Sequence, residues 1–241
     1  MRLVVMKFGG SSVADITKIK NVANRVINKK KKYHRVVVVV SASGDTTDEL
    51  IEQAHEITDM PDSRELDMLL ATGEQISAAL LAIAIKSRGY NAISLTGPQA
   101  GIYADGSYTK ARITGIKPQK IVEELKKNKI VIVAGFQGIN PYNDITTLGR
   151  GGSDLTAVAL AAVLKADICE IYTDVDGIYN ADPRVCPCAG KILKISYDEI
   201  LEMAGAGAQV MQARSIEVAK KFNVKIEVKS SFLNKPGTII S

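Results

Sequence analysis

The chain has 241 residues, of which 46% are hydrophobic, and its 31 basic and 26 acidic residues give a net charge of +5. This length and apolar content predict a globular protein with a sizeable core, as one large domain or two closely joined lobes. Aromatic residues make up 5% of the chain, and no zinc-finger, RNP or helix-turn-helix signature occurs, which argues against a nucleic-acid partner. The start MRLVVMKFGG has no signal-peptide pattern and no apolar run reaches membrane-spanning length, so we expect a cytoplasmic protein without a membrane partner.

The cysteines and histidines form no recognisable catalytic or metal-binding pattern. Cys186 and Cys188 have the wrong spacing for a zinc knuckle, and with Cys169 they make an odd number, so we expect reduced thiols. His34 lies in a charged linker and His55 on a polar helical stretch. We therefore expect neither histidine catalysis nor a metal ion held directly by protein side chains.

The first part of the chain alternates strands, small-residue loops and helices. Residues 3–8 indicate a buried strand that ends in KFGGSS, and apolar residues recur at helical spacing from 16 to 27. The run Lys29 to Lys32 follows, and we interpret it as a solvated helix end. Residues 36–40 are all valine, which is typical of a strand in the middle of a parallel sheet. The loop SASGDTT then leads into a helix from Asp48 onward.

A long apolar helix is predicted between Asp62 and Ile85. Asp62 with Glu65 resembles a capping box at its start. The pair Gly73-Glu74 costs helix stability in the interior, so we expect a packing or ligand-binding reason for it. Residues 92–95 form a short strand, and short strands or a hairpin follow to Thr114, with Arg112 exposed to a cleft.

The remaining segments continue the alternation. In chain order we expect a helix from Pro118 to about Asn128, a strand 130–134, a loop 135–138, a helix 155–165, a strand 168–173, an irregular segment through 184, helices near 197–204 and 208–222, and a last strand 225–228. This order predicts the α/β class: a three-layer αβα sandwich with a mostly parallel central sheet. Residues 1–241 then form one domain, with a soft boundary around 140–170 between an amino-terminal and a carboxyl-terminal lobe.

The stretch TTLGRGGSDLTAVAL, residues 146–160, has the composition of an anion site. Gly149, Gly151 and Gly152 can adopt positive φ and let a ligand approach backbone N–H groups, while Ser153 or Asp154 can cap the following helix. A plain glycine turn is the alternative reading of the loop taken alone.

The loops at the carboxyl ends of the strands are the expected ligand site of a parallel α/β sheet. They carry Lys7, Ser41, Gly135, Asp174 and Arg184. The spacing of glycines and acidic residues excludes a P-loop, a Rossmann fingerprint and an EF-hand. Lys7 and Arg184 supply the positive charge that phosphoryl transfer needs. A carboxylate acceptor is already ionised at neutral pH, which suits a chain without a catalytic histidine.

Five stretches in this order resemble the aspartate kinases, a branch of the amino acid kinase superfamily. They are KFGGSSV from Lys7, SASGDTTDEL from Ser41, ATGEQISAALL from Ala71, TTLGRGGSDLTAVALA from Thr146 and YTDVDGIYNADPR from Tyr172. The resemblance implies the amino acid kinase fold and ATP-dependent phosphorylation of the β-carboxylate of L-aspartate to 4-phospho-L-aspartate, the entry to lysine, threonine and methionine synthesis. It also implies Mg²⁺, held mainly by the nucleotide phosphates.

The resemblance implies roles for individual positions. Lys7 grips the transferring phosphate, and Asp154 orients Lys7 and the substrate. The implied nucleotide positions are Lys7, Gly9, Gly10, Ser11, Thr173, Asp174, Tyr179, Asp182, Arg184 and Gln209. The implied aspartate positions are Ser41, Thr47, Glu74, Phe136, Arg150, Gly152, Ser153 and Asp154. Glu74 complements the ammonium of a free amino acid, and Arg150 a carboxylate, as a fork that lysine could not replace.

Two departures from the family pattern concern the nucleotide and regulation. Gln209 stands where many members carry a lysine that reaches the nucleotide, which removes one cation. The sequence stops at Ser241, where typical members continue into paired ACT regulatory domains. We therefore expect no feedback inhibition by lysine or threonine from this chain alone, with a separate regulatory subunit as one alternative. The family resemblance further implies a homodimer.

Two other functions stay open at this point. A sister kinase acting on glutamate, acetylglutamate or UMP would share the fold, although Glu74 with Arg150 favours a free amino acid. A non-catalytic ligand-binding or regulatory subunit would keep the fold without turnover. Retention of Lys7, Arg150, Asp154 and Arg184 argues against that second reading.

Overall fold

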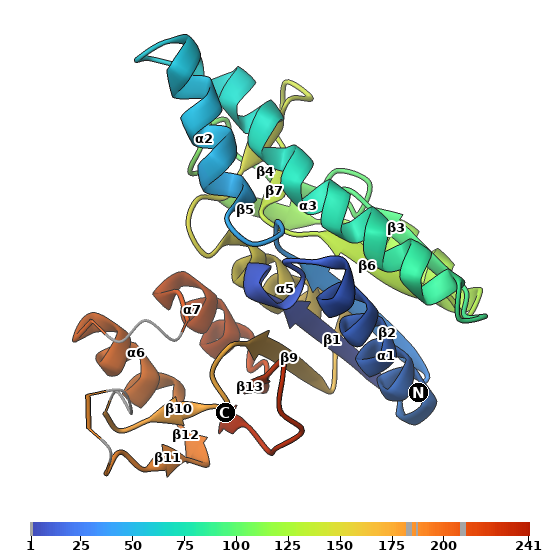
Figure 1. The fold of residues 1–241 in the computed structure, drawn as a ribbon, viewed down its shortest axis with the longest axis vertical. Helices are drawn as coiled ribbons and strands as arrows, with labels where there is room; N and C mark the ends of the chain where they lie inside the picture. Colours follow the sequence, from blue (N-terminus) through green and yellow to red (C-terminus); the bar gives the residue numbers. More distant parts are fainter. Residues whose placement is uncertain (1, 182–184, 187, 208–210) are drawn as a thin grey trace.

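The main sheet of the protein has eight strands and lies at its centre (Figure 1). The structure, a computed structural model, describes residues 2–181, 185–186, 188–207 and 211–241. The strands are β1 (Leu3–Phe8), β2 (Arg35–Val40), β3 (Ala92–Leu95), β6 (Ile130–Ala134), β9 (Ile168–Thr173), β12 (Lys194–Ile195), β13 (Ile226–Ser230) and β14 (Thr238–Ile240), in the order β12-β14-β13-β9-β1-β2-β6-β3. Neighbouring strands are parallel except β13 and β14. The predicted, mostly parallel central sheet is confirmed.

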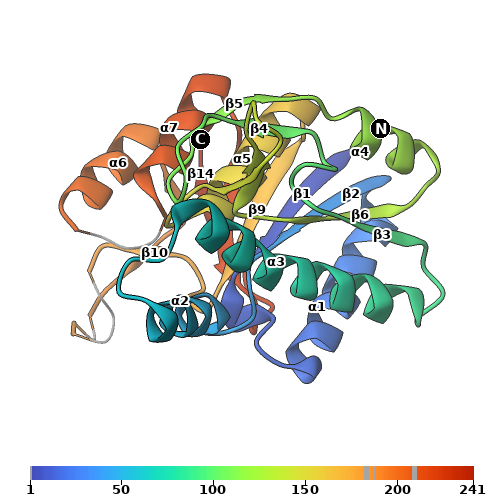
Figure 2. The same ribbon diagram turned by 90° about the horizontal axis from the view of Figure 1, so that it is seen from above.

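Helices cover both faces of this sheet, as Figure 2 shows. They are α1 (Ile16–Lys32) and α3 (Ser63–Lys86) on one face, and α4 (Gln119–Lys126), α5 (Gly152–Leu164), α6 (Tyr197–Gly205) and α7 (Ala213–Phe222) on the other. Successive strand residues alternate between the two layers: Val4 and Met6 pack under α1 and α3, while Leu3 and Val5 join the core under α5. Because both layers are apolar, β1 and β2 must be apolar on both faces, which explains the unbroken valine run.

A second, four-stranded sheet lies beside the main one. Its strands are β4 (Ile102–Ala104), β5 (Ile113–Ile116), β7 (Gln137–Ile139) and β8 (Ile145–Thr147), in the order β5-β4-β7-β8. The expected hairpin before Thr114 corresponds to the antiparallel pair β4 and β5. The loop expected at 135–138 is wrong in part, because Gln137 and Gly138 pair with β8. These strands are short and bury polar Gln137, Thr146 and Thr147, so they have no apolar pattern to detect.

Several helix and strand ends differ from the predictions. Helix α2 (Thr46–Ile57) begins before Asp48, and α7 begins at Ala213 and not near 208. The predicted last strand is followed by β14, which lies between β13 and the edge strand β12. The two-residue strand β10 (Ile178–Tyr179) lies in the segment expected to be irregular, and it pairs antiparallel with β11 (Lys191–Ile192), for which no strand was predicted.

The capping box predicted for α3 forms only in part. The carboxylate of Asp62 accepts hydrogen bonds from the N–H groups of Arg64 and Glu65, at 3.0 and 3.1 Å. The Glu65 side chain does not return to the start of the helix but pairs with the Arg64 guanidinium at 2.7 Å. The Glu65 carboxylate therefore pairs with the neighbouring Arg64 guanidinium in place of the backbone N–H at the helix start.

Helix α3 contradicts the expectation that no apolar segment of the chain reaches membrane-spanning length. Its residues Ser63–Lys86 are long and apolar enough to cross a membrane, with a mean hydropathy of 1.7 over an 18-residue window. Half of that window is buried inside the protein, where Leu81 and Ile85 pack on the sheet. The helix thus serves as the core helix of one layer. The three cysteines are not joined by a disulfide in the structure, and Sγ of Cys186 lies 2.7 Å from Sγ of Cys188.

Candidate active site

A cavity of about 560 Å³ opens at the carboxyl ends of β1, β2 and β6, the edge at which the sequence places the ligand. It brings together all eight predicted substrate positions with part of the predicted phosphate loop. The predicted residues that line it are Lys7, Gly10, Ser41, Thr47, Glu74, Phe136, Arg150, Gly152, Ser153 and Asp154. Segments far apart in the sequence therefore converge on one site, because parallel strands end at the same edge.

Lys7 and Asp154 form an ion pair within the cavity. Lys7 is next to last in β1, between Val39 of β2 and Ile171 of β9, and is 9% exposed. Its Nζ lies 2.8 Å from Oδ1 of Asp154, in the first turn of α5. The positive end of the α5 dipole favours a carboxylate at that position. The pair fixes the direction of the lysine and leaves its remaining ammonium hydrogens for a ligand.

The glycine loop has the backbone that its composition predicts. Gly149 and Gly151 have φ of 70° and 73°, the left-handed region that favours glycine. A Cβ on Gly151 would lie 1.8 Å from Cγ of Gln212, so a side chain cannot fit there. The expected cap is wrong, because Gly151 itself precedes the first residue of α5 and makes no side-chain cap. Starting the helix at Gly152 frees Ser153 and Asp154 to face the site.

The glycine loop is held from the far side by α7. Nη2 of Arg214 donates hydrogen bonds to the carbonyl oxygens of Leu148 and Arg150, at 2.7 and 3.3 Å. The Arg150 side chain itself is exposed and lines the cavity. Arg214 was not singled out from the sequence, because a cation near a helix start looks like an ordinary surface residue.

The start of α5 is packed tightly against β6. A Cβ on Gly135 would lie 2.7 Å from Oγ of Ser153, so the loop after β6 can pass the helix only as glycine. Phe136 follows with φ of 68°, an uncommon value for a bulky residue. Such local strain occurs preferentially at functional sites, and Phe136 lines the cavity.

Glu74 is a buried carboxyl group in the cavity wall, 3% exposed. Its Oε1 accepts a hydrogen bond from the Ala42 N–H at 3.1 Å, while its Oε2 has no partner among the described residues. Burial raises the pKa of Glu74 to about 7, against a smaller lowering by the Ala42 N–H. Gly73 has the packing reason expected of it, since a Cβ there would meet Cβ of Ala42 at 2.8 Å.

Asp67 holds the same wall together and was missed by the sequence reasoning. It is 0% exposed, and accepts hydrogen bonds from Oγ1 of Thr147 at 2.5 Å and from the Thr109 N–H at 2.9 Å. Burial raises its pKa, while these hydrogen bonds act in the opposite direction. Asp67 and Glu74 stand about two helical turns apart on one buried face of α3. The sequence signal that could have identified Asp67 is the presence of two acidic residues on the apolar face of one helix.

The predicted phosphate loop after β1 is only partly available to a ligand. The Gly9 N–H, expected to bind phosphate, donates instead to the Tyr172 carbonyl at 3.2 Å. Gly10 and Ser11 open a short 3₁₀ helix (Gly10–Ser12), whose first N–H groups lack intrahelical partners. A Cβ on Gly10 would lie 2.8 Å from the Ala42 carbonyl, so glycine is required for the two loops to approach.

The predicted nucleotide positions after β9 lie outside this cavity. Oγ1 of Thr173 donates to the Asp174 carboxylate at 2.8 Å, and the Tyr179 hydroxyl donates to Asp176 at 2.7 Å. Thr173 follows Tyr172, whose carbonyl binds Gly9, so this segment adjoins the phosphate loop. Asp182, Arg184 and Gln209 lie outside the described residues.

A mostly parallel sheet, a lysine at the end of its first strand and an aspartate at a glycine-loop helix start define a phosphate-handling α/β fold. The chain belongs to the amino acid kinase family, whose model matches residues 2–230.

Within that family the chain is similar to aspartokinases. It is 55% identical over 240 residues to an aspartokinase of Bacillus sp. (strain MGA3), covering 100% of this chain and 58% of that protein. The crystal structure of aspartate kinase from Synechocystis has a TM-score of 0.88 at 45% identity, covering 99% of this chain and 39% of the other. Aspartokinase III of E. coli in complex with aspartate and ADP has a TM-score of 0.87 at 27% identity, with 99% and 64% covered. The chain thus spans little more than half the length of the Bacillus relative.

Proposed function

We propose that this chain transfers the γ-phosphoryl group of ATP to the β-carboxylate of L-aspartate, giving 4-phospho-L-aspartate and ADP. The observation that carries the proposal is the charge pattern of one cavity. Oε2 of Glu74 has no partner among the described residues, Arg150 lines the same cavity, and Lys7 is paired to Asp154. Aspartate has one ammonium and two carboxylates, which matches this set of one acceptor and two cations. Similarity to aspartokinases, one of them bound to aspartate and ADP, supports the same substrates.

Substrate recognition begins with Glu74. Its unpartnered Oε2 can accept a charge-assisted hydrogen bond from the aspartate ammonium. An adjacent cation favours the ionised carboxylate, so the ligand lowers the raised pKa of Glu74. Arg150 binds a carboxylate through two parallel hydrogen bonds. Together the two side chains orient the β-carboxylate toward Lys7.

Phosphoryl transfer then needs positioning and charge stabilisation more than a base. The β-carboxylate, with an ordinary pKa of about 3.9, is already ionised. One of its oxygens attacks the γ-phosphorus, the bond from that phosphorus to the β–γ bridging oxygen breaks, and ADP leaves with the electron pair. Lys7 binds the oxygens of the transferring group, while Asp154 holds Lys7 in place. Mg²⁺, carried on the nucleotide phosphates, would neutralise part of their charge.

The nucleotide is proposed to bind between the phosphate loop and the segment after β9. Gly10 and Ser11 donate backbone N–H groups to phosphate, and Thr173, Asp174 and Tyr179 contact the remainder of the nucleotide. Their position next to Lys7 and Gly9 supports this assignment. Asp182, Arg184 and Gln209 are assigned to the nucleotide from the sequence resemblance alone.

The location and the assembly of the protein are also proposed. We infer a cytoplasmic homodimer in which residues 1–241 alone are not inhibited by lysine or threonine. Light scattering tests the dimer, and turnover with and without added lysine or threonine tests the regulation.

The test of the reaction is a hydroxamate assay with aspartate, ATP and Mg²⁺, because hydroxylamine traps an acyl phosphate. We expect turnover with aspartate and none with glutamate or acetylglutamate. UMP would give UDP, which hydroxylamine does not trap, so ADP release is measured for UMP, and none is expected. Turnover with one of those three and not with aspartate would establish a sister kinase. ATP binding without turnover on any substrate would establish a non-catalytic subunit.

A further inference from the structure

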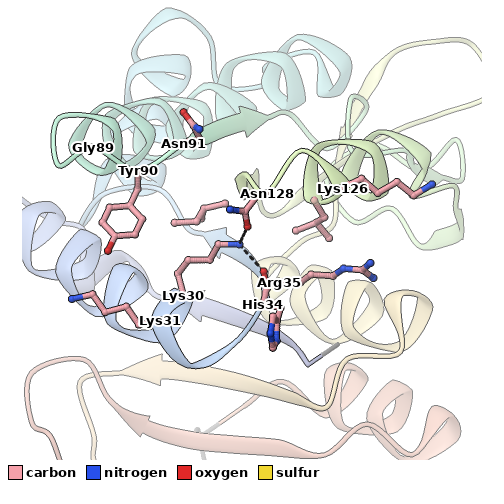
Figure 3. Close-up of a pocket in the computed structure, with 11 residues that line it drawn as sticks. Lys30, Lys31, His34, Arg35, Gly89, Tyr90, Asn91, Lys126 and Asn128 are labelled. Carbon is pink, nitrogen blue, oxygen red and sulfur yellow. Dashed lines mark hydrogen bonds between the residues drawn. The ribbon is translucent and has the colours of Figure 1, made fainter.

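A second cavity, of about 650 Å³, lies at the opposite edge of the main sheet. Its wall forms at the amino-terminal ends of β2, β6 and β3, where Arg35, Ile130 and Asn91 stand (Figure 3). Strand β2 runs from Arg35 at this cavity to the residue before Ser41 at the candidate active site, a span of about 17 Å. None of the described residues lines both cavities.

The lining of this cavity is positively charged. Lys30, Lys31, Arg35 and Lys126 line it together with His34, and no carboxylate does so among the described residues. Within the same part of the chain, these four cations have no ion-pair partner within 4 Å. The solvated helix end predicted for Lys29 to Lys32 fits the exposed Lys31 and Lys32, whereas Lys30 is partly buried.

The nearest lysines in the sequence behave differently. Lys29 pairs with Glu170 at 2.5 Å. Glu124 accepts the ammonium groups of Lys127 and Lys129 at 2.9 and 2.5 Å, and that of Lys120 at 3.4 Å. The nearby acidic side chains are thus already engaged by cations outside the cavity. The positive charge inside it is left without a counter-charge from the described residues.

Lys30 is held in place by neutral oxygens. Its Nζ donates hydrogen bonds to the His34 carbonyl at 2.6 Å and to Oδ1 of Asn128 at 2.8 Å, the dashed lines in Figure 3. Burial lowers the pKa of Lys30, as expected where a cation loses water without gaining an anion. An ammonium has three donors, so one N–H remains for a ligand. An anion in the cavity would remove this electrostatic cost.

We propose that this cavity binds a small molecule that carries two or more phosphate groups. Four cations in one concave site match a ligand with several negative charges, and Lys and Arg are the usual phosphate ligands. A volume of about 650 Å³ lies in the range of small-molecule sites. Leu125 and Ile130 add apolar surface to the lining, and Tyr90, on the same side of the view as Lys31, adds an aromatic ring for the rest of the ligand (Figure 3).

The shape of the site argues for a small ligand over a polymer or a membrane. A nucleic acid or a lipid surface is best met by a long or flat basic face, often with aromatic side chains on which bases stack. Here the four cations line one concavity, and Tyr90 is its single aromatic lining residue in the described chain. The site is also separate from the proposed phosphoryl-transfer centre, so the two proposals stand or fall independently.

The probe that tests this site is inorganic triphosphate, titrated by calorimetry. All proteins carry Lys7→Ala, so that phosphate binding at the catalytic edge is suppressed. In that background we compare a cavity variant, Lys31→Gln/Arg35→Gln/Lys126→Gln, with a matched variant, Lys20→Gln/Lys165→Gln/Lys194→Gln, which removes the same charge from exposed positions. Affinity should fall at least tenfold in the cavity variant and stay within twofold in the matched variant. Thermal melts verify that each protein is folded.

A second measurement keeps the test independent of the variants. Triphosphate added to the protein with intact cavity should shift the backbone amide NMR signals of Gly89, Asn91 and Asn128, and leave Gly149 and Gly151 unchanged. Equal losses of affinity in both triple variants, or shifts spread over the basic surface, would mean non-specific attraction and overturn the proposal. Binding of RNA or anionic vesicles without binding of triphosphate would overturn it as well.

Discussion

Lysines at the two edges of the central sheet are held in opposite ways. At the carboxyl edge, Nζ of Lys7 is paired to the Asp154 carboxylate. At the amino edge, Nζ of Lys30 is bound by a carbonyl and an amide oxygen. A carboxylate orients an ammonium group and neutralises part of its charge, which suits a side chain that must point in one direction. Neutral oxygens fix it and leave its charge to be neutralised by a ligand. The same residue type is therefore held by a charged partner at one edge and by neutral partners at the other.

The largest effect is expected from removing the ammonium group of Lys7, which Asp154 orients. Lys7→Ala should reduce turnover about 10³-fold, because the charge on the transferring phosphoryl group loses its stabilising donor. Asp154→Asn keeps the shape but weakens the hold on Lys7, so a smaller loss is expected. The hydroxamate assay measures both. Similar losses in Lys126→Gln would remove the distinction between the two edges.

Glu74→Gln should raise the KM for aspartate roughly 10- to 100-fold, the effect of losing one charge-assisted hydrogen bond. The kcat should change less, because Glu74 does not contact the transferring phosphoryl group. Steady-state kinetics over a range of aspartate concentrations separates the two constants. An unchanged KM would remove Glu74 from the substrate site.

The same substitution should change the pH dependence of stability. The pKa of Glu74 is about 7 when folded, against 4.5 as its ordinary value. Between these values the unfolded chain ionises while the folded protein stays protonated, so the free energy of unfolding falls as pH rises through this window. The fall is about 3 kcal/mol and should be absent in Glu74→Gln. Urea unfolding at pH 5 and pH 8 measures it, and parallel curves for the two proteins would contradict it.

Gly151→Ala should destabilise the protein by about 1–3 kcal/mol and weaken aspartate binding. The added methyl group meets Gln212 at a backbone φ of 73°. Gly205→Ala is the matched control, because nothing lies within 4 Å of a Cβ there and its φ is not positive. Thermal melts compare the two. If Gly151→Ala/Gln212→Ala recovers part of the stability, the collision with Gln212 accounts for that part.

The smallest effect is expected at the amino edge. Lys126→Gln should change stability by less than about 0.5 kcal/mol, since no ion pair with a described residue is lost. Turnover of aspartate should be unchanged as well. Thermal melts and the hydroxamate assay test both statements, and a clear loss of stability would mean that Lys126 has a structural partner.

The sequence was sufficient to predict those parts of the site that local patterns encode. The valine run placed β2, and glycines with polar neighbours placed the loops at Ser41 and Gly151. Contacts between distant segments were out of reach, because no local pattern specifies them. Arg214 reaches the glycine loop across 66 positions at Leu148, and Asp67 reaches Thr147 across 80.

The second sheet escaped prediction for a related reason. Strands β4, β7 and β8 have three residues each, too few for an alternation to show. The start of α5 was misplaced because two capping candidates, Ser153 and Asp154, follow Gly151. The structure places Asp154 inside the helix, where it pairs with Lys7.

Because Oε2 of Glu74 has no partner among the described residues, aspartate binding there should release a proton, which calorimetry can detect. Below pH 7 the empty protein carries a proton on this carboxyl group, and an arriving ammonium would expel it to the solvent. The measured heat of aspartate binding then includes the ionisation heat of whichever buffer accepts the proton. Titrations in phosphate and in imidazole at pH 6.5 should therefore give different apparent enthalpies for the same affinity. The size of that difference counts the protons released per aspartate bound.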